Sequence, residues 1–189
     1  MTWRVLRETE SRLIMTTTNR IMASGLSIGI AGLLSIMALE GFDPVATRPV
    51  PNDPYTYGHG ATVRADGKPV QKNDTITRQA ASALLQKQVD DEYSAAIRRC
   101  AGDVPMTQYE FDAAVALAYN IGWPKVCSST MIKEFRAGRY AEGCRAIMLF
   151  DRLHGRKCSL PENRNRKDGC RGVMNRRMKE YKMCIGEIS

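Results

Sequence analysis

The sequence predicts an α+β fold in which a small β-hairpin lobe precedes a larger, mainly helical lobe, with a cleft between the two. Two observations predict this order. Residues 55–64 have the composition of a short strand, and the Asp66-Gly67 pair that follows them is a hairpin turn signal. From residue 77 to the end of the chain, helix caps and apolar residues at helical spacing replace the strand pattern.

The helices are predicted from their first and last residues. Thr77 can cap a helix whose apolar positions run to Ile97. Thr107 and Glu110 form a capping-box pattern ahead of an apolar run that Gly122 can end. We expect three further helices, at residues 130–137, 140–149 and 172–184. The chain has no internal repeat, and its 189 residues suit one such domain.

Residues 21–39 form an apolar run without a charged residue. At about 1.5 Å per residue, a helix of this length just crosses a hydrocarbon core of about 30 Å. Nine of the 19 residues are Gly, Ala or Ser, so we expect marginal insertion. Four arginines and two glutamates precede the run, which favours a cytoplasmic N-terminus. A cleaved signal peptide and a buried soluble helix are the alternatives.

The apolar run divides the chain into three parts. We interpret residues 1–20 as a basic cytoplasmic extension, residues 21–39 as a signal-anchor segment, and residues 40–189 as the folded domain that is exported. Met15 is a second possible start, so the first residues could lie outside the fold.

The net charge of +8 is concentrated near the C-terminus. Residues 152–182 contain eleven lysines and arginines against three acids, which is a local excess of +8. A basic surface of this kind favours a polyanionic partner, such as nucleic acid, anionic lipid or an anionic cell wall. A solvated helix face is the alternative, and the predicted export argues against nucleic acid.

All six cysteines lie in the C-terminal half, with no C-x-x-C pair among them. The only histidines are His59 and His154, so a zinc site is disfavoured and no metal or cofactor is expected. An even number of widely spaced cysteines suits disulfides and an oxidising compartment, with reduced core cysteines as the alternative. Fifteen pairings are possible. Cys158 and Cys170, on either side of a charged loop, are the preferred local pair.

Glu40 is the first charged residue after the apolar run. A loop with four prolines follows at residues 41–54, and we expect it to be extended and irregular. A carboxyl at the end of an apolar helix is partly shielded from water, which favours the protonated form that a general acid needs in glycoside cleavage. Asp53 and Thr56 could hold an attacking water across the cleft. A glutamate, an aspartate and a threonine at this kind of spacing also occur by chance. The prediction of glycoside cleavage therefore depends on the order of the surrounding elements.

Five segments in order complete the pattern: "EG" at residues 40–41, "TYGHG" at 56–60, "AYNIG" at 118–122, "CSSTMIKEFRAGRY" at 127–140 and "GVMNRRMKEYKMC" at 172–184. In these segments the sequence resembles the phage lysozymes (endolysins) of glycoside hydrolase family 24, over roughly residues 38–185. The apolar run that leads directly into Glu40 is similar to the signal-arrest-release subgroup, whose members are exported, stay tethered and inactive, and act once the N-terminal segment leaves the bilayer.

The resemblance implies a lysozyme-like fold and a catalytic domain at residues 40–189. It implies that Glu40 is the general acid and that Thr56 orients the attacking water. It also implies that Gly58 and Gly60 let the backbone approach the sugar, and that Tyr119 and Asn120 bind substrate. The implied reaction is hydrolysis of the β-1,4 bond between N-acetylmuramic acid and N-acetylglucosamine in peptidoglycan, which lyses the host cell at phage release.

Nothing in the sequence suggests a cofactor or demands more than a monomer, and the export signal and the cysteines argue against binding of nucleic acid. The expected location of the protein is the periplasmic face of the host inner membrane while tethered, and the periplasm after release. The glycines of the run would let it leave the bilayer.

One departure from the family concerns the second carboxylate. The family places an aspartate nine residues after the glutamate, where this chain has Pro49. Asp53 is the nearest candidate, thirteen residues after Glu40, and Asp43 is a fainter one. His59, between the two glycines, is interpreted as a loop or strand residue. A glutamate-only lytic transglycosylase and a non-catalytic membrane-anchored wall-binding protein are the remaining alternatives.

Overall fold

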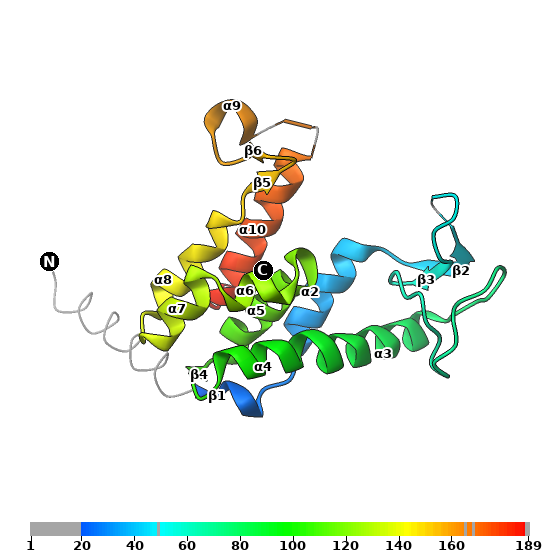
Figure 1. Cartoon of the computed structure of the whole chain (residues 1–189), viewed down its shortest axis with the longest axis horizontal. Coiled ribbons are helices and arrows are strands. Elements are labelled where there is room, and N and C mark those ends of the chain that lie inside the picture. Colours follow the sequence, from blue (N-terminus) through cyan, green and yellow to red (C-terminus); the bar gives the residue numbers. More distant parts are fainter. Residues whose placement is uncertain (1–19, 49, 165, 168, 188–189) are drawn as a thin grey trace, which may run out of the picture.

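The structure is a computed structural model, and it describes residues 20–48, 50–164, 166–167 and 169–187. The predicted extension at residues 1–20 therefore lies, apart from Arg20, outside the described residues. Figure 1 shows a small lobe that carries β2 and β3 beside a larger helical body. The predicted α+β division into a hairpin lobe and a helical lobe is confirmed.

The small lobe is built on β2 (Asp43–Thr47) and β3 (Thr56–Gly58), which pair antiparallel. The prediction of an irregular loop over residues 41–54 is wrong at β2. Pro44 fits the strand because its carbonyl oxygen accepts a hydrogen bond from the Ile76 amide at 3.0 Å, while Ala46 donates to Asp74 at 2.8 Å. The predicted strand at residues 55–64 is shorter than expected. The Asp66-Gly67 turn is confirmed, with Gly67 at φ +81° and Arg64 N–H bonded to the Lys68 carbonyl at 2.8 Å.

A continuous helical segment leads from the small lobe into the body (Figure 1). It consists of α3 (Arg78–Gln88), the π-helical turn η2 (Val89–Ser94) and α4 (Ala95–Ala101). The remaining helices are α5 (Gln108–Ile121), α6 (Trp123–Cys127), α7 (Thr130–Arg136), α8 (Tyr140–Arg145), the 3-10 turn η3 (Ala146–Leu149), α9 (Pro161–Arg164) and α10 (Cys170–Cys184). Two short antiparallel pairs are β1 (Ile21–Met22) with β4 (Pro105–Met106), and β5 (Arg152–Leu153) with β6 (Arg156–Lys157).

The predicted caps are confirmed. The Thr77 hydroxyl accepts from the Ala80 amide at 3.2 Å, and Thr107 and Glu110 form both bonds of the capping box at the start of α5. Residues 110–118 of α5 are all buried, and α2 and α10 pack against it, so α5 is the centre of the core. Its alanines let those helices approach closely.

Residues 21–39 are not one helix in this structure. They form β1, the 3-10 turn η1 (Ala23–Gly25), an extended stretch and most of α2 (Ile30–Glu40). Ala23, Leu26 and Ile36 are buried in the main core, so in this conformation the segment is part of the folded domain. Within the described part of the chain, none of the helices combines the length and the apolar character needed to span a bilayer.

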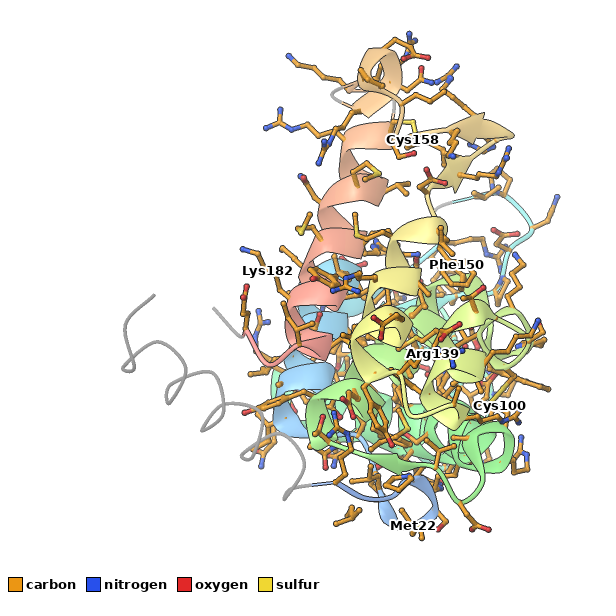
Figure 2. All side chains as sticks on the ribbon, turned by 90° about the vertical axis from the view of Figure 1, so that its left-hand side faces the viewer. Met22, Cys100, Arg139, Phe150, Cys158 and Lys182 are labelled. Carbon is orange, nitrogen blue, oxygen red and sulfur yellow. A yellow bond between two sulfur atoms is a disulfide. The ribbon has the colours of Figure 1, made fainter. Side chains whose placement is uncertain are left out.

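The six cysteines form three disulfides. The predicted pair Cys158–Cys170 is confirmed, and it holds the β5–β6 hairpin and α9 against the start of α10. Figure 2 shows Cys158 toward one end of α10 and Lys182 toward the other. The other two disulfides are Cys100–Cys127 and Cys144–Cys184, which tie α4 to α6 and α8 to the end of α10.

Candidate active site

Glu40 is the last residue of α2, as predicted, and Gly41 ends the helix at φ +72°. The predicted shielding of Glu40 from water is wrong, because its side chain is exposed. The chain leaves α2 at Gly41 for β2 instead of folding back over the last turn. The carboxylate is therefore accessible to a ligand.

Two tyrosines lie near enough to Glu40 for its charge to act on them. Gly32 and Ile36 form the buried face of α2, and Glu40 follows Ile36 by four residues at the exposed end of the helix. Tyr93 and Tyr119 contact each other, with ring centroids 5.0 Å apart. Burial raises the pKa of Tyr119 to about 12, and the negative charge of Glu40 adds to this effect. The pKa of Tyr93 is also raised, first by burial and then by the charges of Glu92 and Glu40.

Tyr93 reaches this position from the π-helical turn η2, and sequence reasoning did not find it. The spacing of the apolar residues indicates the π turn in the sequence. Ala81, Leu85, Val89, Tyr93 and Ile97 follow one another every four residues, whereas an α-helix has 3.6 residues per turn. The wider π turn keeps this stripe on one side of the helix. Such turns occur frequently at functional sites.

The hairpin lobe holds the other predicted groups. Thr56 is half-buried and lies opposite Thr47. Asp53 is exposed in the loop that joins the two strands. Asp43 lies at the other end of β2, opposite Gly58. Asp53 and Thr56 therefore both lie at the loop end of the hairpin. Asp43 lies at the opposite end of β2, about 13 Å away along the strand.

The two predicted glycines differ in their surroundings. Gly58 has φ +63°, and a Cβ there would lie 2.9 Å from the Ala81 Cβ, so the contact with α3 already requires glycine. Gly60 has φ +87°, and its Cβ side is open. His59 between them is buried, and its Nδ1–H donates to the carbonyl of Gly41. His59 thus ties this turn to the end of α2.

Asn120 is exposed at the end of α5, and its side-chain oxygen accepts from Arg177 Nη2 at 2.6 Å. Arg177 is buried on α10 and also donates to Glu180 at 2.9 Å. Neither Arg177 nor Glu180 was found from the sequence. Burial raises the pKa of Glu180 to about 7, although Arg177 opposes this effect.

A groove of about 670 Å³ begins at Leu39 and Asn120, next to Glu40, and runs along α10. Part of the basic segment at residues 152–182 lines it. The lining cations are Lys125, Arg152, Arg176, Arg177 and Lys179, and no acid lines it among the described residues. Within the same part of the chain, no three His, Cys, Asp or Glu side chains lie close enough to hold a metal ion.

The arrangement defines a class of protein: a lysozyme-like fold with an exposed carboxylate and an aromatic wall on the helical lobe, beside a hairpin lobe that carries a hydroxyl and a second carboxylate. The family model "Phage lysozyme" matches residues 37–180, and the chain belongs to this family.

The chain is similar to the endolysin of Bacillus phage B103, with 29% identity over 132 residues, or 69% of this chain. That match spans about half (48%) of the B103 protein. It is also similar to the SAR-endolysin of Pseudomonas phage phiKMV, with 29% identity over 82% of this chain and 86% of that protein. Among solved structures, the endolysin from Escherichia coli O157:H7 phage FAHEc1 superposes with a TM-score of 0.68 at 30% identity, covering 87% of this chain and 96% of that one.

Proposed function

We propose that the protein is an endolysin of glycoside hydrolase family 24 that hydrolyses the β-1,4 bond between N-acetylmuramic acid and N-acetylglucosamine in peptidoglycan, and that it lyses the host cell at phage release. The observation that carries the proposal is the position of Glu40. It is an exposed carboxyl at the end of a helix packed on the core, near enough to Tyr93 and Tyr119 for its charge to raise their pKa values. The membership of the phage lysozyme family supports the same reaction.

In the proposed reaction Glu40 donates a proton to the glycosidic oxygen. The rings of Tyr93 and Tyr119 offer an apolar surface on which a sugar can stack. The Thr56 hydroxyl orients the attacking water, and Asp53 is the candidate base that accepts a proton from it. The open side of Gly60 leaves room for the glycan chain, and Asn120 offers its side-chain amide.

A lytic transglycosylase is the second candidate. It is favoured by the position of Asp53, which lies in the hairpin loop only three residues before Thr56. A glutamate-only enzyme would close the muramic acid onto itself instead of adding water. Its product would be an anhydro-sugar, which mass analysis of the released muropeptides distinguishes from a hydrolysed end.

We further propose that residues 21–39 first hold the exported protein in the host inner membrane, on its periplasmic side, and later leave the bilayer to complete the fold. The uncharged run and its glycines support this. So does the similarity to a protein named as a SAR-endolysin. Three disulfides suit the oxidising periplasm, and the cations near α10 suit an anionic wall.

The test is the clearing of chloroform-permeabilised Gram-negative cells by the full chain, since α2 packs on α5 and contributes Ile36 to the core. The parent, Glu40→Gln and Asp53→Asn are compared. We expect the parent to clear the suspension and Glu40→Gln to lose this activity. Loss with Asp53→Asn identifies the second carboxylate, whereas retained clearing favours the transglycosylase. If the folded parent does not clear, the wall-binding alternative replaces the proposal.

A further inference from the structure

Asp112 on α5 is buried, and its carboxylate is fully engaged with the start of α2. One oxygen accepts from the Gly29 amide at 2.8 Å and from Gln108 Nε2 at 2.8 Å. The other oxygen accepts from the Gly32 amide at 3.2 Å. The first amides of a helix have no partner within the helix, and Gly29, at the N-cap, has no side chain to supply one. Asp112 therefore caps α2 from another helix.

The contact with Asp112 depends on two glycines. A Cβ at Gly29 would lie 2.8 Å from Asp112 Oδ2, and a Cβ at Gly32 would lie 2.9 Å from the Asp112 Cβ. Any larger residue would push the start of α2 away from α5. Gly25, in the same segment, has no atom within 4 Å of a Cβ built on it. Close approach therefore explains Gly29 and Gly32, but not Gly25.

Helices α2 and α5 pack against each other, with Gly32 and Asp112 toward their first residues and Glu40 and Tyr119 toward their last. Glu40 follows Gly32 by eight residues, which is about 12 Å along α2. Tyr119 follows Asp112 by seven residues, so both lie on one face of α5 about 10 Å apart. Since α2 packs on α5 and the charge of Glu40 acts on Tyr119 near the end of α5, the two helices run in the same direction. Asp112 holds α2 at the end opposite to Glu40.

We propose that Asp112 is a positioning residue for Glu40, which it holds in place through the cap on the start of α2. This inference rests on the proposed catalytic role of Glu40. With residues 29–32 out of the fold, the Asp112 carboxylate keeps Gln108 as a hydrogen-bond partner but loses the Gly29 and Gly32 amides, and the start of α2 loses its cap. When this segment is in the fold, Asp112 fixes the start of α2, and the helix in turn fixes the position of Glu40 at its other end.

The test uses the full chain with Asp112→Asn and Gly32→Ala, and with Gly25→Ala as the matched control. Both glycine changes add the same methyl group to the same apolar run, so they change its hydrophobicity equally. Hydrolysis of purified peptidoglycan is measured at a temperature where circular dichroism shows each variant to be folded. We expect kcat to fall about tenfold or more in Asp112→Asn and Gly32→Ala with little change in KM, because small displacements of a catalytic group are costly. Gly25→Ala should keep the parent values.

The outcomes separate this inference from the proposed function. An active parent whose kcat is kept in folded Asp112→Asn and Gly32→Ala overturns the positioning role. A loss that only follows the unfolded fraction, or an equal loss in Gly25→Ala, overturns it as well. A folded parent without any activity overturns the proposed function instead, and the positioning role with it.

Discussion

Glu40 at the end of α2 and Tyr119 near the end of α5 are close enough for the charge of the glutamate to add to burial in raising the pKa of the tyrosine to about 12. The phenol therefore stays protonated at neutral pH. It can donate a hydrogen bond and present its ring, but it cannot act as a base.

Substitutions of Tyr119 should separate the ring from the hydroxyl. Tyr119→Phe keeps the ring and should keep kcat/KM on peptidoglycan within about threefold, with an unchanged pH profile. Tyr119→Ala removes the stacking surface and should raise KM about fivefold, since an aromatic contact is worth about 1 kcal/mol. Steady-state kinetics of the two variants check this. Equal losses in both would show that the hydroxyl, and not the ring, is required.

Gly58 should be more sensitive to substitution than Gly67. Both have positive φ, so alanine at either position costs about 1–2 kcal/mol. Gly58→Ala also places a Cβ 2.9 Å from that of Ala81, whereas Gly67 is open. We expect Gly58→Ala to lower the free energy of unfolding by at least about 1 kcal/mol more than Gly67→Ala. Urea denaturation measures both, and equal losses would contradict the packing of β3 on α3.

Glu180 should make stability depend on pH. Burial raises the pKa of Glu180 from 4.5 to about 7 in the folded state. Its contribution is therefore fully present below the unfolded pKa and is lost as pH rises through about 7. We expect the free energy of unfolding to fall between pH 5 and pH 8, by about 1.4 kcal/mol per unit of pKa difference. Denaturation of the parent and Glu180→Gln checks this. An equally steep fall in Glu180→Gln would exclude Glu180 as the cause.

The disulfides should differ in their contribution to stability. Cys158–Cys170 joins residues 12 apart in a small satellite cluster, and Cys144–Cys184 joins residues 40 apart in the main core. Loop closure predicts losses of about 3 and about 4 kcal/mol when each pair is replaced by serine. Thermal unfolding of the two double variants should give the lower Tm for Cys144→Ser/Cys184→Ser. The reverse order would contradict this ranking.

The sequence predicted what local chemistry determines. Thr77, Thr107 and Glu110 cap helices through neighbours three residues away, and Asp66-Gly67 forms a turn by itself. The chain between Cys158 and Cys170 is short, so this pair could be predicted as well.

The features that the sequence could not predict depend on distant residues. The β2 strand forms around Pro44 because residues 74–76 supply hydrogen bonds on its other side. The cap of Asp112 on Gly32 joins residues 80 apart in the chain. The exposure of Glu40 depends on the direction in which the chain leaves Gly41, which no pattern near the glutamate indicates.

The most direct test of the account is the release of new sugar ends from purified peptidoglycan by the full chain, followed by mass analysis of the muropeptides. Parent, Glu40→Gln and Glu142→Gln are compared, because Glu142 is an exposed glutamate on α8 paired with Arg145. We predict that Glu40→Gln lowers the rate by about 100-fold or more, as expected for a general acid, while Glu142→Gln keeps it. Unchanged release by folded Glu40→Gln would contradict the central claim that Glu40 is the catalytic acid.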